Sequence, residues 1–330
     1  MSADPGNGWG AGRPAVAFVG LSCRDHAWRV ERFPPTASRT PALGYRAAGG
    51  GPAATAAVAA ARLGADARLW AIHGDDEDGR ANAAELASFG VALGGVRAPA
   101  GARSFVSAVL VDPEGERSIF PYRGAGLEDD PTHHDWRGLE GCGAVLVDAR
   151  HPVLAAHALA WAEARGVPRV GDWGDDRHPE LRARIDHLVA AEEAGALALA
   201  ARGTAAPNDP LEAAALGTSA LRDAPTQLVA ITLGARGCVW DDGQRVWHQV
   251  APRVAVVDTN GAGDAFHGAF AAAIAAGWDA AASFRLATAV AALKCTGEGR
   301  AALPDLATAR AVADALPTAT DLGPSTGGPA

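Results

Sequence analysis

The sequence predicts an α/β protein in which a central, mostly parallel sheet lies between helices and carries a small β lid. Two observations predict this class. Along most of the chain, short apolar runs of the kind found in buried strands alternate with alanine-rich helical segments. Repeated strand–helix units form parallel sheets that helices cover on both faces. Earlier in the chain, short segments with partly alternating polarity come in two pairs, as expected of strands with one exposed face.

In the first half of the chain, glycine and proline mark the ends of the expected elements. Ala15–Gly20 is an apolar run that ends in glycine and predicts the first buried strand. Pro52 stands where a first helical turn tolerates proline, and the helix Ala53–Leu63 ends at Gly64. The strand Arg68–Ile72 and the helix Gly79–Phe89 follow. The lid strands, near residues 28–47 and 104–122, are expected at Trp28–Phe33, Leu43–Ala47, Ser104–Val111 and Arg117–Tyr122.

In the second half, strands and helices alternate regularly. The expected strands are Ala144–Val147, Pro168–Gly171, Ile185–Val189, Leu228–Leu233 and Val254–Val257. The expected helices are Val153–Arg165, His178–Arg184, Glu192–Ala200, Ala262–Ala276 and Ala280–Cys295. Together these elements predict one domain over residues 15–317, after a flexible N-terminus of residues 1–14. Residues 318–330 are rich in Thr, Gly and Pro and are expected to form a disordered tail.

Charge and composition argue against several classes of partner. The net charge of −9 disfavours nucleic acid and anionic membranes, because both require a basic surface. The most apolar stretch, Ala265–Ala276, is mostly alanine and predicts a buried helix rather than a membrane span. The cysteines lie far apart without a CxxC pair, which fits a reducing cytoplasm: Cys23, Cys142, Cys238 and Cys295.

The segment from Asp258 to Asp264, DTNGAGD, has the pattern of an anion site that also carries a base. An expected strand leads into a glycine turn and then into a helix, so freed backbone N–H groups and the helix dipole would attract an anion. Asp264 falls in the first helical turn beside that anion. A carboxylate there would repel a merely bound phosphate, but it suits a base that takes the proton of a hydroxyl attacking the phosphate. The alternative is that Asp264 only caps the helix.

DTNGAGDAFHGAF closely resembles the second signature of the ribokinase-like (PfkB-type) carbohydrate kinases, although the family usually has Thr where this chain has Asn260. The resemblance covers roughly Ala15 to Leu316 and implies a ribokinase-like fold. It implies that Asp264 is the catalytic base and that the amides of Gly261, Ala262 and Gly263 form the anion hole. Asp258, Thr259 and Asn260 would then contribute to the ATP side of the centre.

Three further segments fit the same resemblance. Thr232-Leu233-Gly234-Ala235-Arg236-Gly237 is similar to the family's TxGxxG turn, so Thr232, Gly234 and Gly237 would lie near the ATP phosphates. Gly49-Gly50-Gly51 resembles the first signature, whose glycines let the backbone approach the sugar, with Thr55 in place of the usual Asn. Asp25 matches an aspartate that holds substrate hydroxyls, and its alternative is a solvated loop acid.

The resemblance implies ATP and Mg²⁺ as cofactors, and a monovalent cation is a further candidate. The family's Asn-x-x-Glu motif corresponds to Ala190-Ala191-Glu192-Glu193, which lacks the asparagine. Glu192 and Glu193 are therefore candidate residues for organising the metal. The alternative interpretation is that they are exposed acidic residues in a first helical turn.

Within the family, the chain most resembles the sulfofructose kinases of bacterial sulfoglycolysis. Three segments carry this resemblance: Gly49–Ala65, Ala291–Asp305 and Val147-Asp148-Ala149-Arg150. In that subgroup Arg150 would hold the sulfonate, and Arg39 stands where the subgroup has a lysine. Pro121 stands where the subgroup has a polar asparagine, so the chain departs from the subgroup at this position.

The resulting hypothesis is a sugar kinase that transfers the ATP γ-phosphate to a primary hydroxyl of a ketose, most specifically O1 of 6-deoxy-6-sulfofructose. Another PfkB-type kinase (ribokinase, fructokinase or phosphofructokinase-like) and a non-catalytic sugar or nucleotide sensor are the alternatives. The expected partners are a sugar, ATP and a second copy of the chain that pairs through the lid, with no nucleic acid and no membrane.

Overall fold

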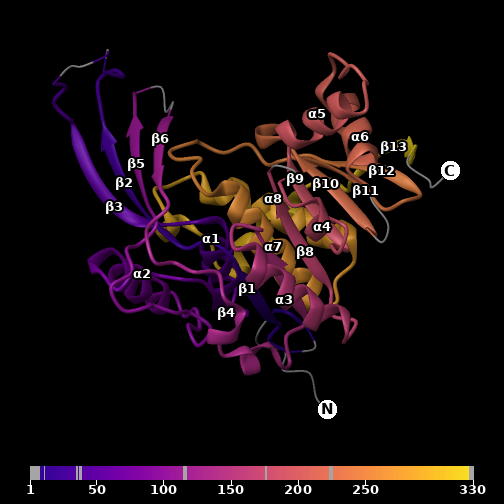
Figure 1. Cartoon of the computed structure of the whole chain (residues 1–330). Coiled ribbons are helices and arrows are strands. Elements are labelled where there is room, and N and C mark those ends of the chain that lie inside the picture. The colour runs from indigo at the N-terminus through magenta and orange to yellow at the C-terminus, as the bar shows by residue number, and fades with distance from the viewer. Residues whose placement is uncertain are drawn as a thin grey trace.

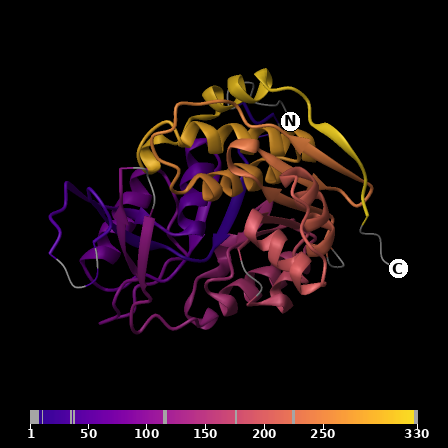
Figure 2. The same cartoon turned by 90° about the horizontal axis from the view of Figure 1, so that it is seen from above.

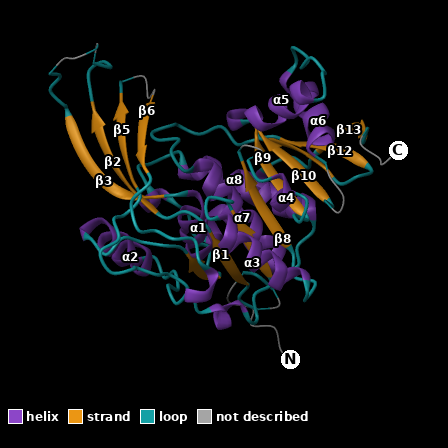
Figure 3. Cartoon of the chain, in the orientation of Figure 1, coloured by secondary structure: helices purple, strands orange, loops and turns teal. Residues whose placement is uncertain are grey.

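The computed structural model of the chain describes residues 8–10, 12–34, 36, 39–113, 117–174, 177–222 and 226–326 (Figure 1). A large sheet runs through the middle of the molecule, and a smaller sheet projects from one side of it (Figure 3). The α/β class predicted from the sequence is confirmed.

Over the described residues the large sheet has nine strands in the order β13-β12-β11-β10-β9-β8-β7-β1-β4. The pairs from β4 to β10 are parallel, and those from β10 to β13 are antiparallel. The strands are β1 (Ala15–Val19), β4 (Asp66–Trp70), β7 (Ala144–Val147), β8 (Arg169–Trp173), β9 (His187–Ala191), β10 (Leu228–Thr232), β11 (Cys238–Asp241), β12 (Arg245–Gln249) and β13 (Thr320–Pro324). The parallel strands end at one edge of the sheet, which places the loops that follow them side by side.

Helices cover both faces of this sheet (Figure 2). Side chains of β1 alternate between the two cores: Val16 and Phe18 enter one, Ala17 and Val19 the other. The first core holds α1 (Pro52–Arg62), α7 (Ala262–Ala275), α8 (Ala280–Lys294) and α9 (Leu306–Ala315). The second core holds α3 (Pro152–Glu163), α4 (Pro179–Arg182), α5 (Glu192–Ala201) and α6 (Pro210–Leu221).

The lid is a sheet in the order β3-β2-β5-β6, formed by β2 (Cys23–Arg29), β3 (Gly44–Gly50), β5 (Val106–Val111) and β6 (Arg117–Tyr122). The β2–β5 pair is parallel and the two outer pairs are antiparallel. The helix α2 (Glu77–Ser88) packs against β2 and β3, and His26 lies 3.2 Å from Asp78 across that contact. The lid is therefore held to the core at one end, and its inner face lies over the carboxyl edge of the large sheet.

The prediction of a strand at Val254–Val257 is wrong. This segment is a loop, and the side chains of Val256 and Val257 are 62% and 60% exposed. Its backbone bonds to the loop after α8, because the amides of Val257 and Asp258 both donate to the carbonyl of Cys295. The place beside β12 is taken by β13 instead.

Other boundaries also move. The lid strand expected at Trp28–Phe33 is β2, which begins five residues earlier and ends at Arg29. Residues 318–330 are not a fully disordered tail, because Thr320–Pro324 form β13. In the N-terminal segment, Trp9 is buried, donates to the carbonyl of Leu63 at 2.8 Å and packs on Trp278. Residues 1–7 and 327–330 lie outside the described residues.

No helix in the described part of the chain is both long enough and apolar enough to span a membrane. The four cysteines are free thiols.

Candidate active site

Gly261 begins the site because it turns the chain into α7. It is the N-cap of this helix with a φ of 76°, a left-handed conformation that favours glycine. The amide of Ala262 donates to the carbonyl of Thr259 at 3.2 Å and closes the turn. Within the described residues, the amides of Gly261 and Gly263 have no protein acceptor. Of the three amides expected to form an anion hole, that of Ala262 is therefore already used, and those of Gly261 and Gly263 lie at the positive end of the helix dipole without a protein acceptor.

Asp264 projects from the first turn of α7 into two neighbouring cavities. Burial, together with the nearby Asp172 carboxylate, raises the pKa of Asp264 to about 7, although His267 and Arg300 act in the opposite direction. A carboxyl group with this pKa exchanges its proton near neutral pH, as a general base must. Capping of α7 does not explain it, since no side-chain cap bond is made.

Asp258 and Lys294 fix the loop that leads to the turn. The ammonium of Lys294 donates to the main-chain carbonyl of Asp258 at 2.9 Å and to its carboxylate at 3.0 Å. The amides of Gly299 and Asn260 donate to the same carboxylate at 3.1 and 2.9 Å. Burial alone would raise the pKa of Asp258, but these hydrogen bonds outweigh it and lower the pKa. Asp258 therefore stays ionised and holds this loop in place.

A small cavity of about 80 Å³ is lined both by the first glycine signature and by Asp264. Its walls include Asp25 from β2, Gly49 and Gly50 from the end of β3, and Asp264. A Cβ on Gly50 would overlap the carboxylate of Asp25, and a Cβ on Gly49 would overlap the guanidinium of Arg300. A larger residue at either position would therefore displace a side chain that lines the cavity, Arg300 at Gly49 or Asp25 at Gly50.

Gly51 has a separate reason to be glycine. It is the N-cap of α1 with a φ of 94°, and a Cβ there would overlap the carbonyl of Leu21. The structure thus brings Asp25, the three glycines and Asp264 together as the sequence predicts.

A second cavity of about 380 Å³ lies on the other side of Asp264 and contains Arg150. The carboxylate of Asp148 anchors this wall, since it accepts from the amides of Leu21, Ala53 and Arg150 at 2.8, 3.1 and 2.9 Å. Ala149 has a φ of 54°, which is strained for a residue with a Cβ. This tight turn at the carboxyl end of β7 places the Arg150 side chain in the cavity. Two other arginines, Arg123 and Arg177, line the same space.

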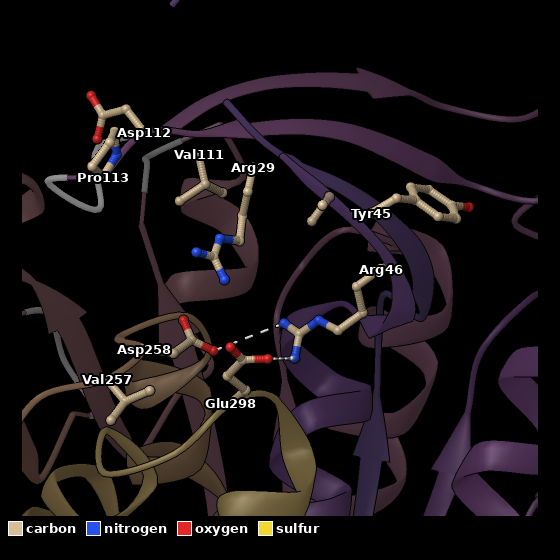
Figure 4. Close-up of a pocket in the computed structure, with 11 residues that line it drawn as sticks. Arg29, Tyr45, Arg46, Val111, Asp112, Pro113, Val257, Asp258 and Glu298 are labelled. Atoms are coloured by element: carbon tan, nitrogen blue, oxygen red, sulfur yellow. Dashed lines mark ion pairs between the residues drawn. The ribbon is translucent and has the colours of Figure 1, made fainter. Parts of the chain in front are cut away.

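A third cavity of about 640 Å³ separates the lid from the core (Figure 4). Arg29 and Arg46 extend from the lid strands into it. Arg46 makes ion pairs of 4.0 Å with Asp258 and 3.6 Å with Glu298. Arg117 of β6 also donates to the hydroxyl of Thr259. Lid side chains thus contact the loop that precedes Asp264.

Arg39 is not brought to the site within one chain. It lies exposed in the connection between β2 and β3 and lines none of the cavities above.

The residues expected near ATP lie along the carboxyl edge of the sheet. Thr232 ends β10, and Gly234 and Gly237 follow it in a tight turn, with a φ of 92° at Gly237. A Cβ on Gly237 would overlap the carbonyl of Gln249. Because β9 and β10 are parallel neighbours, this turn adjoins the start of α5 at Glu192.

The carboxylate of Glu192 is paired with Arg236 at 2.7 Å, and Glu193 is exposed in the first turn of α5. Over the described residues, no group of three or more His, Cys, Asp or Glu side chains could hold a metal ion.

Arg300 is a site residue that the sequence did not single out. It is 6% exposed and lines the small cavity beside Asp264. In the sequence it is one arginine in the glycine-containing segment Gly297–Arg300, and its closest contacts lie more than two hundred residues earlier.

Comparison with known proteins agrees with this geometry. The model of the pfkB family of carbohydrate kinases matches residues 13–306. An ATP-dependent ribose-1-phosphate kinase of Halopiger xanaduensis is 31% identical over 293 residues, which are 88% of this chain and 93% of that protein. A deoxyribokinase of Salmonella typhi is 25% identical and covers 86% of this chain and 93% of its own length. The structure of Arabidopsis thaliana ribokinase complexed with ribose and ATP superposes with a TM-score of 0.77 at 26% identity, over 91% of this chain and 98% of that one.

Proposed function

Because this chain belongs to the pfkB family of carbohydrate kinases, we propose that it transfers the γ-phosphate of ATP to a primary hydroxyl of a sugar that carries a terminal phosphate or sulfonate. As a member of the family it is a phosphotransferase with an alcohol group as acceptor. The observation that carries the substrate class is the position of Asp264 between the cavity of the glycine signature and the cavity of Arg150.

In this proposal the sugar lies against Asp25 and the glycine backbone of β3, with its reactive hydroxyl at Asp264. The carboxylate of Asp264 takes the hydroxyl proton as the oxygen attacks the γ-phosphorus of ATP, and the bond from that phosphorus to the bridging β-phosphate oxygen breaks to release ADP. The amides of Gly261 and Gly263 and the start of α7 stabilise the negative charge of the transferring group. Mg²⁺, when bound with ATP, neutralises charge on the phosphates.

Arg150 is the residue proposed to bind the anionic end of the substrate. Its side chain is exposed in the second cavity, and its guanidinium has no partner among the described residues. A phosphate or sulfonate offers oxygens that match the fork of a guanidinium. The 6-sulfonate of 6-deoxy-6-sulfofructose and the phosphate of ribose 1-phosphate, the substrate in the name of one relative, both meet this requirement.

Pro121 bears on the choice between these sugars. It lies on β6, paired with Ser107 of β5, and proline has no N–H to donate to a ligand. If a lid contact to the sugar is needed at this position, a different residue must supply it. A neutral ribose or fructose is the second candidate class, supported by the sugar kinases among the relatives.

An ADP-release assay with the full chain, ATP and Mg²⁺ tests the proposal. The acceptors are 6-deoxy-6-sulfofructose, fructose 6-phosphate, ribose 1-phosphate, fructose and ribose. Faster release with the anionic sugars than with fructose and ribose is expected. Equal or faster release with the neutral sugars would contradict the anionic class, and binding of ATP and sugar without ADP would favour the sensor alternative.

Replacing Arg150 with alanine should raise the KM for the anionic sugar by about 10- to 100-fold, because a charge-assisted hydrogen bond contributes roughly 1.5–3 kcal/mol. The KM for ATP and the rate with a neutral sugar should change little. Arg165→Ala is the matched control, since Arg165 stacks on Trp161 at the end of α3, outside the cavity. A rise in the KM for ATP instead would assign Arg150 to the nucleotide.

We also propose that two copies pair through their lids. Large apolar side chains are exposed on or beside the two edge strands of the lid, β3 and β6: Leu43, Tyr45, Ile119, Phe120 and Tyr122. Exposed edges with apolar side chains favour association. The mass of the full chain in solution should be that of a dimer, and Phe120→Glu should shift it toward a monomer, whereas a monomeric wild type would contradict the pairing.

A further inference from the structure

Arg300 joins three parts of the molecule at the wall of the small cavity. Its guanidinium donates to the hydroxyl of Thr55 in α1 at 3.1 and 3.2 Å. It also donates to the carbonyl of Gly50 at the end of β3 at 2.9 Å and to the carboxylate of Glu85 in α2 at 3.3 Å. The lid strand and two helices are thus tied to the loop after α8 through one side chain.

The same side chain supplies the cavity with positive charge. Asp25 and Asp264 both line this space, and the other cation there, Lys294, is already paired with Asp258. Arginine remains charged even where burial lowers its pKa, as it does for Arg300. Arg300 also pairs with Glu85 at 3.3 Å, and its charge still acts on the carboxylates of Asp25 and Asp264.

One donor of Arg300 remains for a ligand. A guanidinium has five N–H groups. Those on Nε and Nη2 are used by Thr55 and Gly50, and one on Nη1 by Glu85. The second N–H on Nη1 has no acceptor among the described residues, and Nη1 lies where a Cβ of Gly49 would be.

We propose that Arg300 is a positioning residue of the phosphoryl transfer. It holds β3 against α1 and places a fixed positive charge beside Asp25 and Asp264 in the small cavity, which is called the acceptor cavity below because the proposed function places the sugar there. This inference rests on the proposed function, since it assigns Asp264 as the base. It extends that function by naming a residue that sets both the shape and the charge of the acceptor cavity.

Several other groups also act on Asp264, so the effect of Arg300 must be separated from theirs. Asp172 of β8 and Asp148 after β7 favour the protonated form, and His267, one turn along α7, favours the ionised form. Cys23 on β2 is buried nearby and stays a thiol because burial raises its pKa well above the usual value. The second cavity, on the other side of Asp264, also holds Arg123, Arg150, Arg177 and His178. A change at Arg300 removes one positive charge from the acceptor cavity and leaves all of these groups, together with the Lys294–Asp258 pair, in place.

The test compares Arg300→Gln, Arg300→Lys and Arg24→Gln in kcat/KM against pH. Arg24 is the matched control, because it binds the same carboxylate of Glu85 at 2.7 Å and the lid carbonyl of Ala47, yet lines no wall of the acceptor cavity. Loss of a positive charge disfavours the ionised base, so the acid limb of Arg300→Gln should move upward by about one pH unit. Arg300→Lys should keep the acid limb within about 0.3 units of the wild type and lower kcat, because an ammonium lacks the planar fork.

An acid limb of Arg300→Gln that coincides with the limb of Arg24→Gln would overturn the proposal. If Arg300→Gln does not fold, Thr55→Val replaces it, since this change removes only the hydroxyl that accepts two bonds from the guanidinium. Thr55→Val should raise the KM for the sugar by about 3- to 10-fold, the equivalent of one ordinary hydrogen bond, and an unchanged KM and kcat would contradict the positioning role. A wild type that phosphorylates no sugar would refute the proposed function itself, whereas an active wild type with unaffected variants would refute only this inference.

Discussion

Asp264→Asn should lower kcat by about two to four orders of magnitude, the range expected when a general base is removed. Asparagine has the shape of aspartate but cannot take the proton of the attacking hydroxyl. The change also removes a carboxyl group that burial already disfavours in its charged form, so the fold should keep its stability. Single-turnover kinetics and nucleotide binding by calorimetry, measured on the same preparation, separate chemistry from binding.

The pH profile of the wild type gives an independent check of the same assignment. The base must be ionised to act, and the pKa of Asp264 is about 7. Activity as kcat/KM should therefore rise with pH and reach half of its plateau near pH 7, and this limb should be absent in Asp264→Asn. A variant with near-normal kcat and an unaltered acid limb would show that another group is the base.

Lys294→Met should reduce the free energy of unfolding by about 3 kcal/mol, because removal of one partner of a buried ion pair leaves the other charge uncompensated. The ammonium side chain is 2% exposed and the Asp258 side chain 18% exposed, so water screens the pair little. Lys294 is the only lysine in the chain. An ammonium is a compact charge that fits between a carbonyl and a carboxylate, whereas a guanidinium is larger and planar.

Loss of Lys294 should also lower kcat, because the loop that it fixes leads directly into the anion hole at Gly261. Urea unfolding monitored by circular dichroism measures the stability, and the ADP assay measures kcat. Arg285→Met on the same helix is the control, since Arg285 has no partner among the described residues and lines a cavity away from the site. Equal stabilities of the two variants would show that the Lys294–Asp258 pair contributes nothing measurable.

The local part of the site was predictable because its residues are contiguous in the sequence. Gly261 and Asp264 lie in one turn, and a glycine turn before a helix leaves backbone N–H groups that can bind an anion. The glycines before α1 were predictable through their resemblance to the family's first signature, and the structure adds that Gly51 has a positive φ at the helix start. The alternation of Val16 to Val19 between two apolar cores likewise appears in the sequence as a continuous apolar run.

The segment Val254–Val257 shows where local pattern fails. Its valines have the composition of a buried strand, but a strand also needs a neighbour to pair with. The strand that pairs with β12 is β13, near the C-terminus. The segment Val254–Val257 therefore lies in a loop, in which the amide of Val257 donates to the carbonyl of Cys295. Nothing within a short window of sequence encodes which distant segment takes the place beside β12.

The sequence by itself therefore determined the α/β class, the turn at Gly261 and the identity of the expected base at Asp264. The tertiary structure decided which charges surround that base. Arg300 reaches Thr55 across 245 positions of the chain, and Lys294 reaches Asp258 across 36. Backbone turns follow from interactions between neighbours in sequence, whereas the electrostatics of a cavity depend on groups that only folding brings together. The sequence therefore located the expected base, and the fold determined its charged surroundings.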